Sequence, residues 1–423
     1  MGVKVSVVGG GSTYTPELVE GFATRADRLA IDELVLLDPD RERLEIVGGL
    51  AERMLRRVGW SGELRRTDRR EEALDGARFV IVQLRVGGQR ARLSDETIPG
   101  RFGYIGQETT GPGGFAKALR TLPVVLDLAE EMDRRAEPGA WLVDFTNPTG
   151  IVTQALLDEG HRAIGLCNVA IALQRNLAER FAVPPASVQL DHVGLNHLSW
   201  ERAVVVDGVD RLPEILADPS SFPGTEAFPA ELVRAIGAIP SYYLRYYYLA
   251  RSVLEHQRTD RTRAEEVMEI EAELLEMYRD PKLDEKPELL ARRGGAFYSD
   301  AAAALIASLQ DGTGDVQVVN VRNAGAIPNL PEDDVVEVPA TIDHDGAHPE
   351  PTAPLAPEML GLVQHAKAYE RLTIEAASSG DRTIALKALL ANPLVGDVDG
   401  AIPLLDALLE ENRSFVPRFF PGG

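Results

Sequence analysis

Residues 3–11, VKVSVVGGG, set the class of fold that this chain can adopt. The first six residues are mostly β-branched and apolar, which predicts a buried β-strand over residues 3–8. Three glycines follow at once, and a helix is expected from Pro16. Glycine is needed after such a strand where the backbone must turn tightly and approach a pyrophosphate without a Cβ atom in the way. The pattern therefore predicts the phosphate-binding turn of a dinucleotide site, made by Gly9, Gly10, Gly11, Ser12 and Thr13.

Asp38 closes the second predicted strand, residues 33–37, and supplies the other half of a dinucleotide site. A carboxylate at this place accepts hydrogen bonds from the adenosine ribose and repels a 2′-phosphate, which favours NAD over NADP. The turn departs from the G-x-G-x-x-G pattern because Tyr14 occupies the third glycine position. A glycine-rich turn alone could be a plain tight loop, but the preceding strand and Asp38 together favour nucleotide binding.

Strands and helices alternate through the first third of the chain. Predicted strands lie at residues 3–8, 33–37, 78–84, 140–145 and 163–166, and predicted helices at 16–25, 41–58, 114–135 and 171–181. Strands separated by helices of this length predict an α/β fold, a doubly wound parallel sheet of the Rossmann type with right-handed crossovers. We therefore expect residues 1–170 to form the NAD-binding domain.

The alternation stops after the predicted helix at 171–181. Residues 192–198 and 202–206 predict antiparallel strands, and helices are expected at 240–256, 263–278, 299–308, 357–377 and 381–412, with a flexible loop at 343–357. This pattern is typical of an α+β domain. We expect residues 171–423 to form a second domain that carries the substrate site and the contacts between subunits.

The charge balance and the cysteine content exclude several classes of protein. The chain has 44 basic and 66 acidic residues, a formal net charge of −22, so it repels nucleic acid and anionic membranes. An anionic substrate would need arginines placed locally against this field. Cys167 is the only cysteine, so no disulfide can form within the chain and a reducing compartment fits best. With no signal-peptide pattern and no apolar run of membrane-spanning length, the sequence predicts a cytoplasmic protein.

Polar residues follow two neighbouring predicted strands. Asn147 lies just after one strand, and Cys167 and Asn168 lie just after the next. Ligands of open α/β sheets bind at the carboxyl ends of strands, so these side chains can converge on one crevice. Taken alone, Cys167 fits a small buried apolar residue better than a ligand. Together with His197, from the segment GLNH, it can instead hold a divalent metal with positions left open for substrate oxygens.

Glu108 and Tyr243 belong to two further segments that are rich in polar or aromatic residues. Glu108 lies in a glycine-rich loop at 106–114, GQETTGPGG, which is either a linker or the source of a carboxylate beside the nucleotide. Tyr243 is one of five tyrosines within 241–248, SYYLRYYY, most of which must pack against the core. The residues alone leave both roles open.

Six short motifs occur along the chain: GGGSTYTP at 9–16, GQETTGPGGF at 106–115, DFTNPTG at 144–150, GLCNV at 165–169, GLNHL at 194–198 and YLRYY at 243–247. Their set and their order resemble glycoside hydrolase family 4. The resemblance runs over nearly the full length, through YERLTIEA and ALKALLANP near the C-terminus. Linked motifs of this number are far more specific than a glycine turn alone.

The resemblance implies a lactate/malate dehydrogenase-like fold and the hydrolysis of β-glycosides, especially 6-phospho-β-glucosides, by a redox route. Bound NAD⁺ would oxidise the sugar C3 hydroxyl to a ketone, which acidifies the C2 hydrogen. Removal of the C2 proton would then permit elimination of the C1 leaving group, addition of water and return of the hydride, with no net redox change. A divalent metal, Mn²⁺, would polarise the C2 and C3 oxygens as a Lewis acid.

The resemblance also implies roles for residues at matching positions. Cys167 and His197 would hold the metal. Tyr243 would remove the C2 proton and Glu108 would raise its basicity, although a phenol of pKa about 10 needs a nearby metal to act as a base at neutral pH. The substrate would contact Arg92, Asn147, Asn168 and Arg263. Arginines beside the sugar would answer the need for local cations, although any single arginine could equally form a surface salt bridge.

Asn168 bears on the choice between α- and β-glycosides. Family members that act on α-glycosides have Cys-Asp at this point, and the aspartate serves as the general acid. An asparagine cannot protonate a leaving group, which favours the β-type branch. The chain departs from the related Cys-Asn-Val-Pro pattern at Ala170, so the shape of the loop after the metal site is left open.

Two other functions also remain open from the sequence. An ordinary NAD-dependent hydroxyacid dehydrogenase needs a His–Asp relay, which Asp191 and His192 could supply in part, but it leaves Cys167 and His197 unexplained. A non-catalytic NAD-binding regulator needs neither a base nor a metal. The small-molecule partner would be a glycoside or phosphoglycoside, and the family resemblance implies a homodimer or homotetramer.

Overall fold

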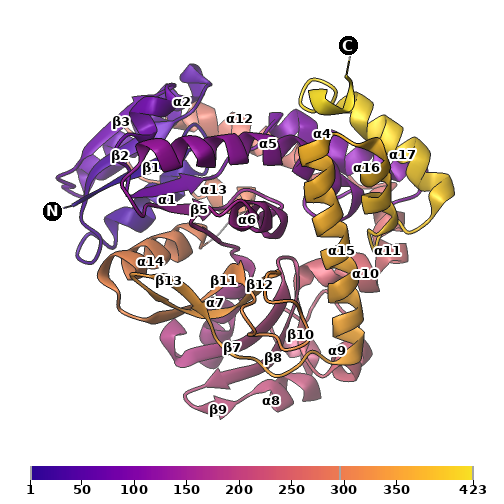
Figure 1. Cartoon of the computed structure of the whole chain (residues 1–423). Helices are drawn as coiled ribbons and strands as arrows, with labels where there is room; N and C mark the ends of the chain where they lie inside the picture. Colours follow the sequence, from indigo (N-terminus) through magenta and orange to yellow (C-terminus); the bar gives the residue numbers. More distant parts are fainter. Residues whose placement is uncertain (1, 295–296, 422–423) are drawn as a thin grey trace.

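A large sheet runs through the computed structural model, which describes residues 2–294 and 297–421. Within these residues the sheet has nine strands in the order β13-β12-β11-β6-β5-β4-β1-β2-β3 (Figure 1). Neighbours from β6 to β3 are parallel, whereas β11, β12 and β13 pair antiparallel at one end. The strand bounds are β1 (Val3–Val8), β2 (Ile31–Leu37), β3 (Glu63–Thr67), β4 (Phe79–Val82), β5 (Trp141–Asp144), β6 (Ala163–Gly165), β11 (Asp315–Arg322), β12 (Val335–Asp343) and β13 (Gly346–Pro349).

Helices cover both faces of this sheet, and alternate strand residues point to the two layers. On one face lie α1 (Thr15–Ala23), α2 (Arg41–Arg57) and α14 (Tyr298–Asp311). On the other lie α3 (Arg70–Leu74), α5 (Gly111–Arg135), α6 (Thr149–Asp158), α16 (Arg382–Leu390) and α17 (Val398–Glu411). The remaining helices are α4 (Gly88–Thr97), α7 (Val169–Phe181), α8 (Leu212–Ala217), α9 (Ala230–Ile236), α10 (Arg245–Tyr248), α11 (Ala250–Gln257), α12 (Arg263–Tyr278), α13 (Leu289–Arg293) and α15 (Pro357–Ser379).

A second, smaller sheet follows the parallel strands in the chain. It is antiparallel and contains β7 (Val188–Leu195), β8 (Leu198–Val206), β9 (Val209–Asp210) and β10 (Ile239–Pro240). Helices α7 and α8 pack against it through a separate group of buried apolar side chains. The hairpin of β7 and β8 has a turn of only two residues, Asn196 and His197, which carries one of the predicted metal ligands.

The predicted α/β fold with a Rossmann-like parallel sheet is confirmed, and the strand at 3–8 has the predicted bounds. The predicted helix at 240–256 is wrong, because the chain forms a 3₁₀ turn at Tyr242–Leu244 and then α10 and α11, with Leu249 between them at φ −121°. The helix expected over 381–412 is two helices, α16 and α17. Within the predicted loop at 343–357, the hairpin strand β13 is formed instead.

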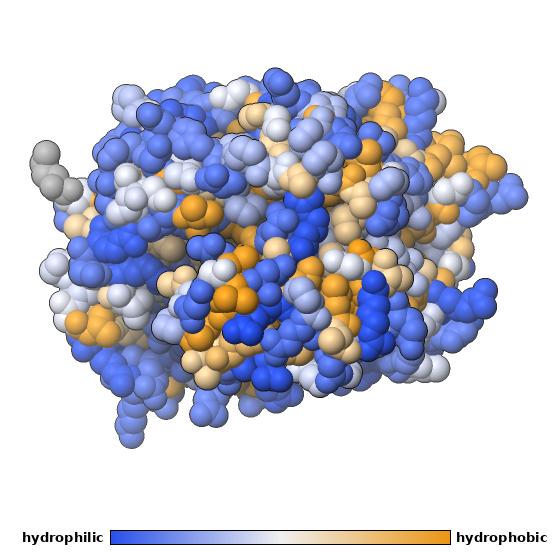
Figure 2. Space-filling view, turned by 90° about the horizontal axis from the view of Figure 1, so that it is seen from below, coloured by the Kyte–Doolittle hydropathy of each residue, from blue (hydrophilic) through white to orange (hydrophobic). Residues whose placement is uncertain are grey.

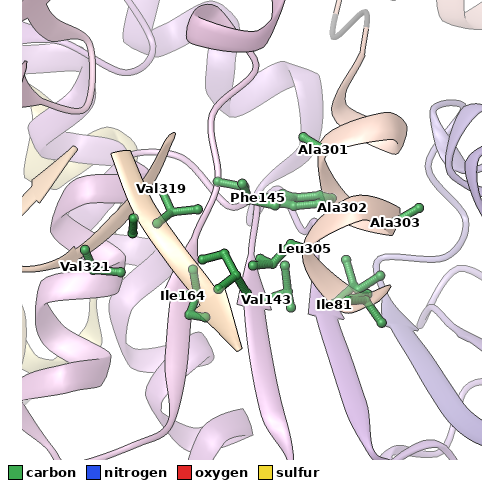
Figure 3. Close-up of a cluster of buried hydrophobic side chains, with 14 of the residues drawn as sticks. Ile81, Val143, Phe145, Ile164, Ala301, Ala302, Ala303, Leu305, Val319 and Val321 are labelled. Atoms are coloured by element: carbon green, nitrogen blue, oxygen red, sulfur yellow. The ribbon is translucent and has the colours of Figure 1, made fainter. Parts of the chain in front are cut away.

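Both halves of the chain build the large sheet. β11 lies against β6 with Asn320 opposite Gly165, so strands from beyond residue 300 continue the sheet that the first half begins. Helix α14 also belongs to the second half, yet its Ala301, Ala302 and Leu305 lie over Ile81 and Val143 of the sheet (Figure 3). Alanines allow this helix to approach the strands closely. The division at 170/171 stays a prediction, and the residues on its two sides share one core.

The surface is largely hydrophilic on the face that Figure 2 shows. Apolar residues there form small groups between polar ones, which is ordinary for a surface exposed to water. In the part of the chain that the structure describes, no helix has both the length and the apolar character needed to cross a bilayer.

Gly10 provides a test of how closely the glycine turn packs on the sheet. A Cβ atom on Gly10 would lie 2.7 Å from Leu36 Cβ and 2.9 Å from Leu36 Cα, within the rigid strand β2. We expect Gly10→Ala to lower the free energy of unfolding by about 2 kcal/mol in urea titrations. Gly49→Ala is the control, because the nearest atom to its Cβ would be Arg53 Nη1 at 3.4 Å. This helical position should gain about 0.5–1 kcal/mol, and equal stability of the two variants would contradict the packing argument.

Candidate active site

The glycine turn joins β1 to α1 and packs against two neighbouring strands. Gly9 has a φ of +90°, and a Cβ atom there would lie 2.8 Å from the carbonyl oxygen of Gln83, which follows β4. A Cβ atom on Gly11 would lie 2.9 Å from the Asp38 carboxyl carbon. The Gly11 amide donates a hydrogen bond of 2.9 Å to Asp38 Oδ2. The turn and the carboxylate predicted to bind ribose are therefore joined directly.

The other residues of the predicted nucleotide turn face different ways. Ser12 lines the adjoining pocket, and its hydroxyl accepts a hydrogen bond of 3.2 Å from the Tyr14 amide. The Thr13 side chain is buried, and its hydroxyl donates to Glu271 of α12 over 3.4 Å. Gly10 lies against Leu36. We expect a pyrophosphate to meet the turn on the Ser12 side, with Gly10 and Thr13 in packing roles.

A pocket of about 1600 Å³ opens beside this turn. Its walls come from both halves of the chain, so a nucleotide on the parallel sheet and a second ligand on the later helices would share one space. The predicted site residues on its walls are Gly9, Gly11, Ser12, Asp38, Arg92, Glu108, Asn147, Asn168, Tyr243 and Arg263.

Cys167 and His197 meet behind the pocket wall. Cys167 follows β6, His197 lies in the turn between β7 and β8, and Cys167 Sγ is 3.5 Å from His197 Nε2. Burial lowers the pKa of His197 to about 4, so its imidazole is neutral and can bind a metal. Burial and the Glu337 carboxylate raise the pKa of the Cys167 thiol to about 12. A bound cation would be needed to ionise this sulfur.

The donor atoms around this pair fit a divalent metal with open positions. Asn147 follows β5 as Cys167 follows the neighbouring β6, and Asn147 Oδ1 is buried with no hydrogen-bond partner among the described residues. A sulfur, an imidazole nitrogen and a spare amide oxygen are ligands that first-row divalent metals accept. Among the described residues, His, Cys, Asp and Glu form no cluster of three or more that could hold a metal. A metal held by this pair would therefore keep coordination positions for oxygens of a substrate or water.

Tyr243 lies directly over His197, one of the two predicted metal ligands. Its ring stacks on the His197 imidazole, with centroids 3.6 Å apart and planes 10° from parallel. Burial raises the pKa of the Tyr243 phenol above its ordinary value, Glu108 adds to this effect and Arg92 opposes it. The phenol therefore keeps its proton unless a positive charge comes close. A metal ion bound to Cys167 and His197 would bring such a charge. The effect of Glu108 has the predicted direction, and its role stays a prediction.

Glu108 is surrounded by cations. Lys117 Nζ lies 2.8 Å from Glu108 Oε2, Arg92 Nη2 lies 3.3 Å from Oε1, and Arg85 forms a third ion pair. Burial opposes ionisation of Glu108, but these cations hold its pKa well below the ordinary value. The sequence missed Arg85, Lys117 and Arg293, which also line the pocket. The place of Arg85 in the sequence could have marked it as a site residue, because it lies just beyond the carboxyl end of β4.

Arg263 and Asn168 occupy the edges of the site. Arg263 lies on the pocket wall at the start of α12, half-exposed, and pairs with Glu266 at 2.8 Å and with the Arg292 carbonyl at 2.6 Å. Asn168 lines the pocket just before α7, and Ala170 is buried in the first turn of that helix. Both alanine and proline are accepted in the first turn of a helix, so the departure at Ala170 leaves the helix start intact.

Asp191 and His192 do not form a relay into the pocket. His192 is fully buried between Glu201, at 2.7 Å from Nδ1, and Glu337, at 3.1 Å from Nε2. Asp191 instead pairs with Arg202 at 3.1 Å. Asp191 and His192 therefore do not supply the relay that a hydroxyacid dehydrogenase needs.

Comparison with known proteins gives matches over most of the chain. Residues 4–183 match the profile of the family 4 glycosyl hydrolases, and residues 192–395 match that of the family 4 glycosyl hydrolase C-terminal domain. A Bacillus subtilis protein described as a probable 6-phospho-β-glucosidase is 43% identical, with 99% of this chain and 98% of that protein covered. The 6-phospho-β-glucosidase of Thermotoga maritima is 40% identical, with 98% and 99% covered.

Solved structures agree with these matches. The Thermotoga maritima 6-phospho-β-glucosidase with manganese, NAD⁺ and glucose 6-phosphate has a TM-score of 0.92 and 39% identity, with 98% of this chain and 99% of that chain covered. Malate dehydrogenase from Plasmodium falciparum has a TM-score of 0.57 at 15% identity, with 89% and 98% covered. The second likeness confirms the dehydrogenase-like fold and carries no information about activity.

Proposed function

The chain belongs to the family 4 glycosyl hydrolases, and from that membership we propose that it hydrolyses 6-phospho-β-glucosides with NAD⁺ and a divalent metal, Mn²⁺. One observation carries the proposal. Tyr243 stacks on His197, which lies 3.5 Å from Cys167, beside a pocket that the glycine turn also lines. The residues proposed to bind the nucleotide, to hold the metal and to act as the base therefore lie close to one another.

The cofactors have separate places on the chain. Gly9, Gly11 and Asp38 would hold NAD⁺, and Cys167 and His197 would hold the metal. When bound, these groups supply a hydride acceptor and Lewis-acid polarisation of the sugar oxygens. The pocket beside these residues, of about 1600 Å³, has room for both a nucleotide and a sugar.

Tyr243 is proposed to move the C2 proton. Once the C3 hydroxyl is a ketone, the C2 hydrogen is acidic and the phenolate oxygen of Tyr243 accepts it. The electron pair of the broken C2–H bond forms a C1–C2 double bond, and the C1–O bond breaks with its electron pair on the aglycone, which departs as an oxyanion. Water then adds at C1 and its spare proton neutralises the aglycone, Tyr243 returns a proton to C2, and return of the hydride to C3 completes the hydrolysis. Glu108 keeps the phenol basic, since its carboxylate raises the pKa of Tyr243.

The 6-phosphate is proposed to interact with the cations of the pocket. Arg85, Arg92 and Lys117 share the Glu108 carboxylate, and Arg92 is also paired with Glu96 at 2.7 Å. Burial and the Arg85 guanidinium lower the pKa of Lys117 to about 7, so the two arginines are the main positive charges here in a chain whose net charge is −22. Arg263 at the pocket edge is a further candidate. A phosphate gains charge-assisted hydrogen bonds from such donors.

Asn168 supports the β-type substrate. Its amide lines the pocket next to Cys167 in the chain and has no acidic proton to transfer to a leaving group. When the aglycone of a β-glycoside is a good leaving group, its elimination from the enolate does not require a carboxylic acid at position 168. We further propose that the enzyme acts in the cytoplasm, which agrees with its single free thiol, and that it assembles as a homodimer or homotetramer.

A panel of four substrates tests this function. With NAD⁺ and Mn²⁺ present, we expect aryl β-glucoside 6-phosphate to be cleaved with a kcat/KM at least about 100-fold above that of the unphosphorylated β-glucoside, because each lost charge-assisted hydrogen bond costs about 1.5–3 kcal/mol. Both α-glucosides should react more slowly than the phosphorylated β-form. Preference for an α-glucoside would contradict the proposal. Stoichiometric NADH from a hydroxyacid would support a dehydrogenase, and NAD⁺ binding without turnover of any substrate would support a regulator.

A further inference from the structure

A buried group of charged side chains lies behind the turn that carries His197. Glu337 of β12 is 2% exposed, and its Oε2 lies 3.1 Å from His192 Nε2. Glu201 of β8 lies on the opposite side of the same ring, 2.7 Å from Nδ1. Burial opposes a charge on His192, but the two carboxylates raise its pKa to about 10, so it is a cation at neutral pH. This charge makes two buried carboxylates tolerable in one place.

The second oxygen of Glu337 reaches the predicted metal site. Glu337 Oε1 accepts hydrogen bonds of 3.0 Å from both Asn196 Nδ2 and Asn320 Nδ2. Asn196 is the chain neighbour of His197, and Cys167 Sγ lies 3.5 Å from His197 Nε2. One carboxylate from β12 is therefore linked, through the Asn196 amide, to the two-residue turn that carries His197. Glu201 has no comparable link within the described residues, because its Oε1 is used by His192 and its Oε2 is buried without a hydrogen-bond partner.

The turn itself needs support from outside. Leu195 and Leu198 are directly paired, so Asn196 and His197 alone reverse the chain between β7 and β8. His197 has a φ of +64°, a left-handed conformation that costs a residue other than glycine about 1 kcal/mol or more. Such a conformation persists when surrounding contacts fix it. The Glu337–Asn196 hydrogen bond and the Tyr243 stack are contacts of that kind.

We propose that Glu337 is a positioning residue for the metal site, which holds the His197 imidazole in place beside the Cys167 sulfur through Asn196. The inference rests on the proposed function, because it takes Cys167 and His197 to be the metal ligands. Outer groups that orient ligands commonly change metal affinity by 10- to 100-fold when they are removed. The cost of removing Glu337 should therefore appear in Mn²⁺ binding and not only in stability.

Mn²⁺ titration of matched variants tests the role of Glu337. The dissociation constant, read from the electron paramagnetic resonance signal of free Mn²⁺, should rise about 10- to 100-fold in Glu337→Ala. Glu201→Ala removes the other carboxylate that contacts His192 and should change the Mn²⁺ dissociation constant by less than about threefold. Glu337→Gln keeps an amide oxygen for Asn196 and should restore most of the affinity. NAD⁺ binding, read by fluorescence, should stay near the parent value in each variant.

Several outcomes would overturn the inference. One is a folded Glu337→Ala variant that binds Mn²⁺ with the affinity of the parent. Another is an equal loss of Mn²⁺ affinity in Glu201→Ala, because this would show that the effect comes from a general loss of stability. Should Glu337→Ala not fold, Asn196→Ala keeps the charged group and cuts only the link, and an unchanged Mn²⁺ affinity there is equally decisive. Cys167→Ala separates the two claims. If Cys167→Ala loses Mn²⁺ binding and Glu337→Ala keeps it, the role of Glu337 is rejected and the metal site stands. If Cys167→Ala binds Mn²⁺ normally, both the metal site and this inference are rejected.

Discussion

Replacing Tyr243 by phenylalanine will lower kcat by about 10³-fold and leave the affinities for NAD⁺ and Mn²⁺ nearly unchanged, because a positioned general base contributes about 10²–10⁴ in rate. The substitution removes one hydroxyl, and the ring can still stack on His197 at 3.6 Å. The loss would therefore be that of the proton acceptor and not of the fold. Steady-state kinetics with aryl β-glucoside 6-phosphate, together with titrations of both cofactors, measure the two effects.

Tyr247→Phe is the matched control for this variant. Tyr247 lies on α10, one turn beyond Tyr243, and packs against the hydrophobic core away from the lining of the pocket. Loss of the Tyr247 hydroxyl should leave kcat within about twofold of the parent value, because removal of one hydroxyl away from the reacting atoms rarely alters the chemical step. A Tyr243→Phe enzyme with parental kcat would exclude Tyr243 as the base. A fall in both variants would point to a defect of packing in this segment.

Replacing either proposed metal ligand will weaken Mn²⁺ binding by at least about 100-fold and abolish glycoside cleavage. Cys167 contributes the sulfur and His197 the neutral imidazole, and the Asn147 amide oxygen with one of them is too weak a set of ligands to hold a divalent ion against water. NAD⁺ binding should persist, because the glycine turn and Asp38 are held by their own contacts. Mn²⁺ titration and activity assays across Mn²⁺ concentrations measure these effects.

His161→Ala is the control for His197→Ala. His161 pairs with Asp133 of α5 at 2.7 Å and has no place in the pocket, so its loss should leave Mn²⁺ affinity and activity unchanged. Chelation of metal from the parent enzyme should reproduce the ligand variants, and added Mn²⁺ should reverse it. Full activity of Cys167→Ala without metal would exclude this pair as the metal site.

The parts of the fold that are continuous in sequence could be predicted well. The strand at 3–8 and its glycine turn are defined by nine consecutive residues, and α12 begins and ends at the predicted residues 263 and 278. Strands of mixed composition were missed. β3, ELRRT, is a polar edge strand, and β12 contains Pro339, which the pattern rules treat as a breaker. Pairing with neighbours gives these segments their structure, and pairing is not a local property.

The site was predicted through motifs, and its geometry required the fold. Cys167 and His197 are 30 residues apart, and their separation of 3.5 Å follows from how the β7–β8 hairpin packs against the large sheet. The motifs named these two residues but gave no sign of Glu337. A carboxylate in a strand normally faces solvent, and only tertiary structure shows that Glu337 is buried between His192 and Asn196.

Hydrolysis in D₂O shows whether the glycosidic bond is broken through proton removal at C2. Glucose 6-phosphate released from a fully protiated 6-phospho-β-glucoside should carry deuterium at C2, because Tyr243 exchanges its proton with solvent before it returns one. Product incubated in D₂O without enzyme controls for spontaneous exchange. Mass spectrometry and proton NMR of the product would show the label, and complete retention of the C2 hydrogen would exclude proton removal at C2 by Tyr243.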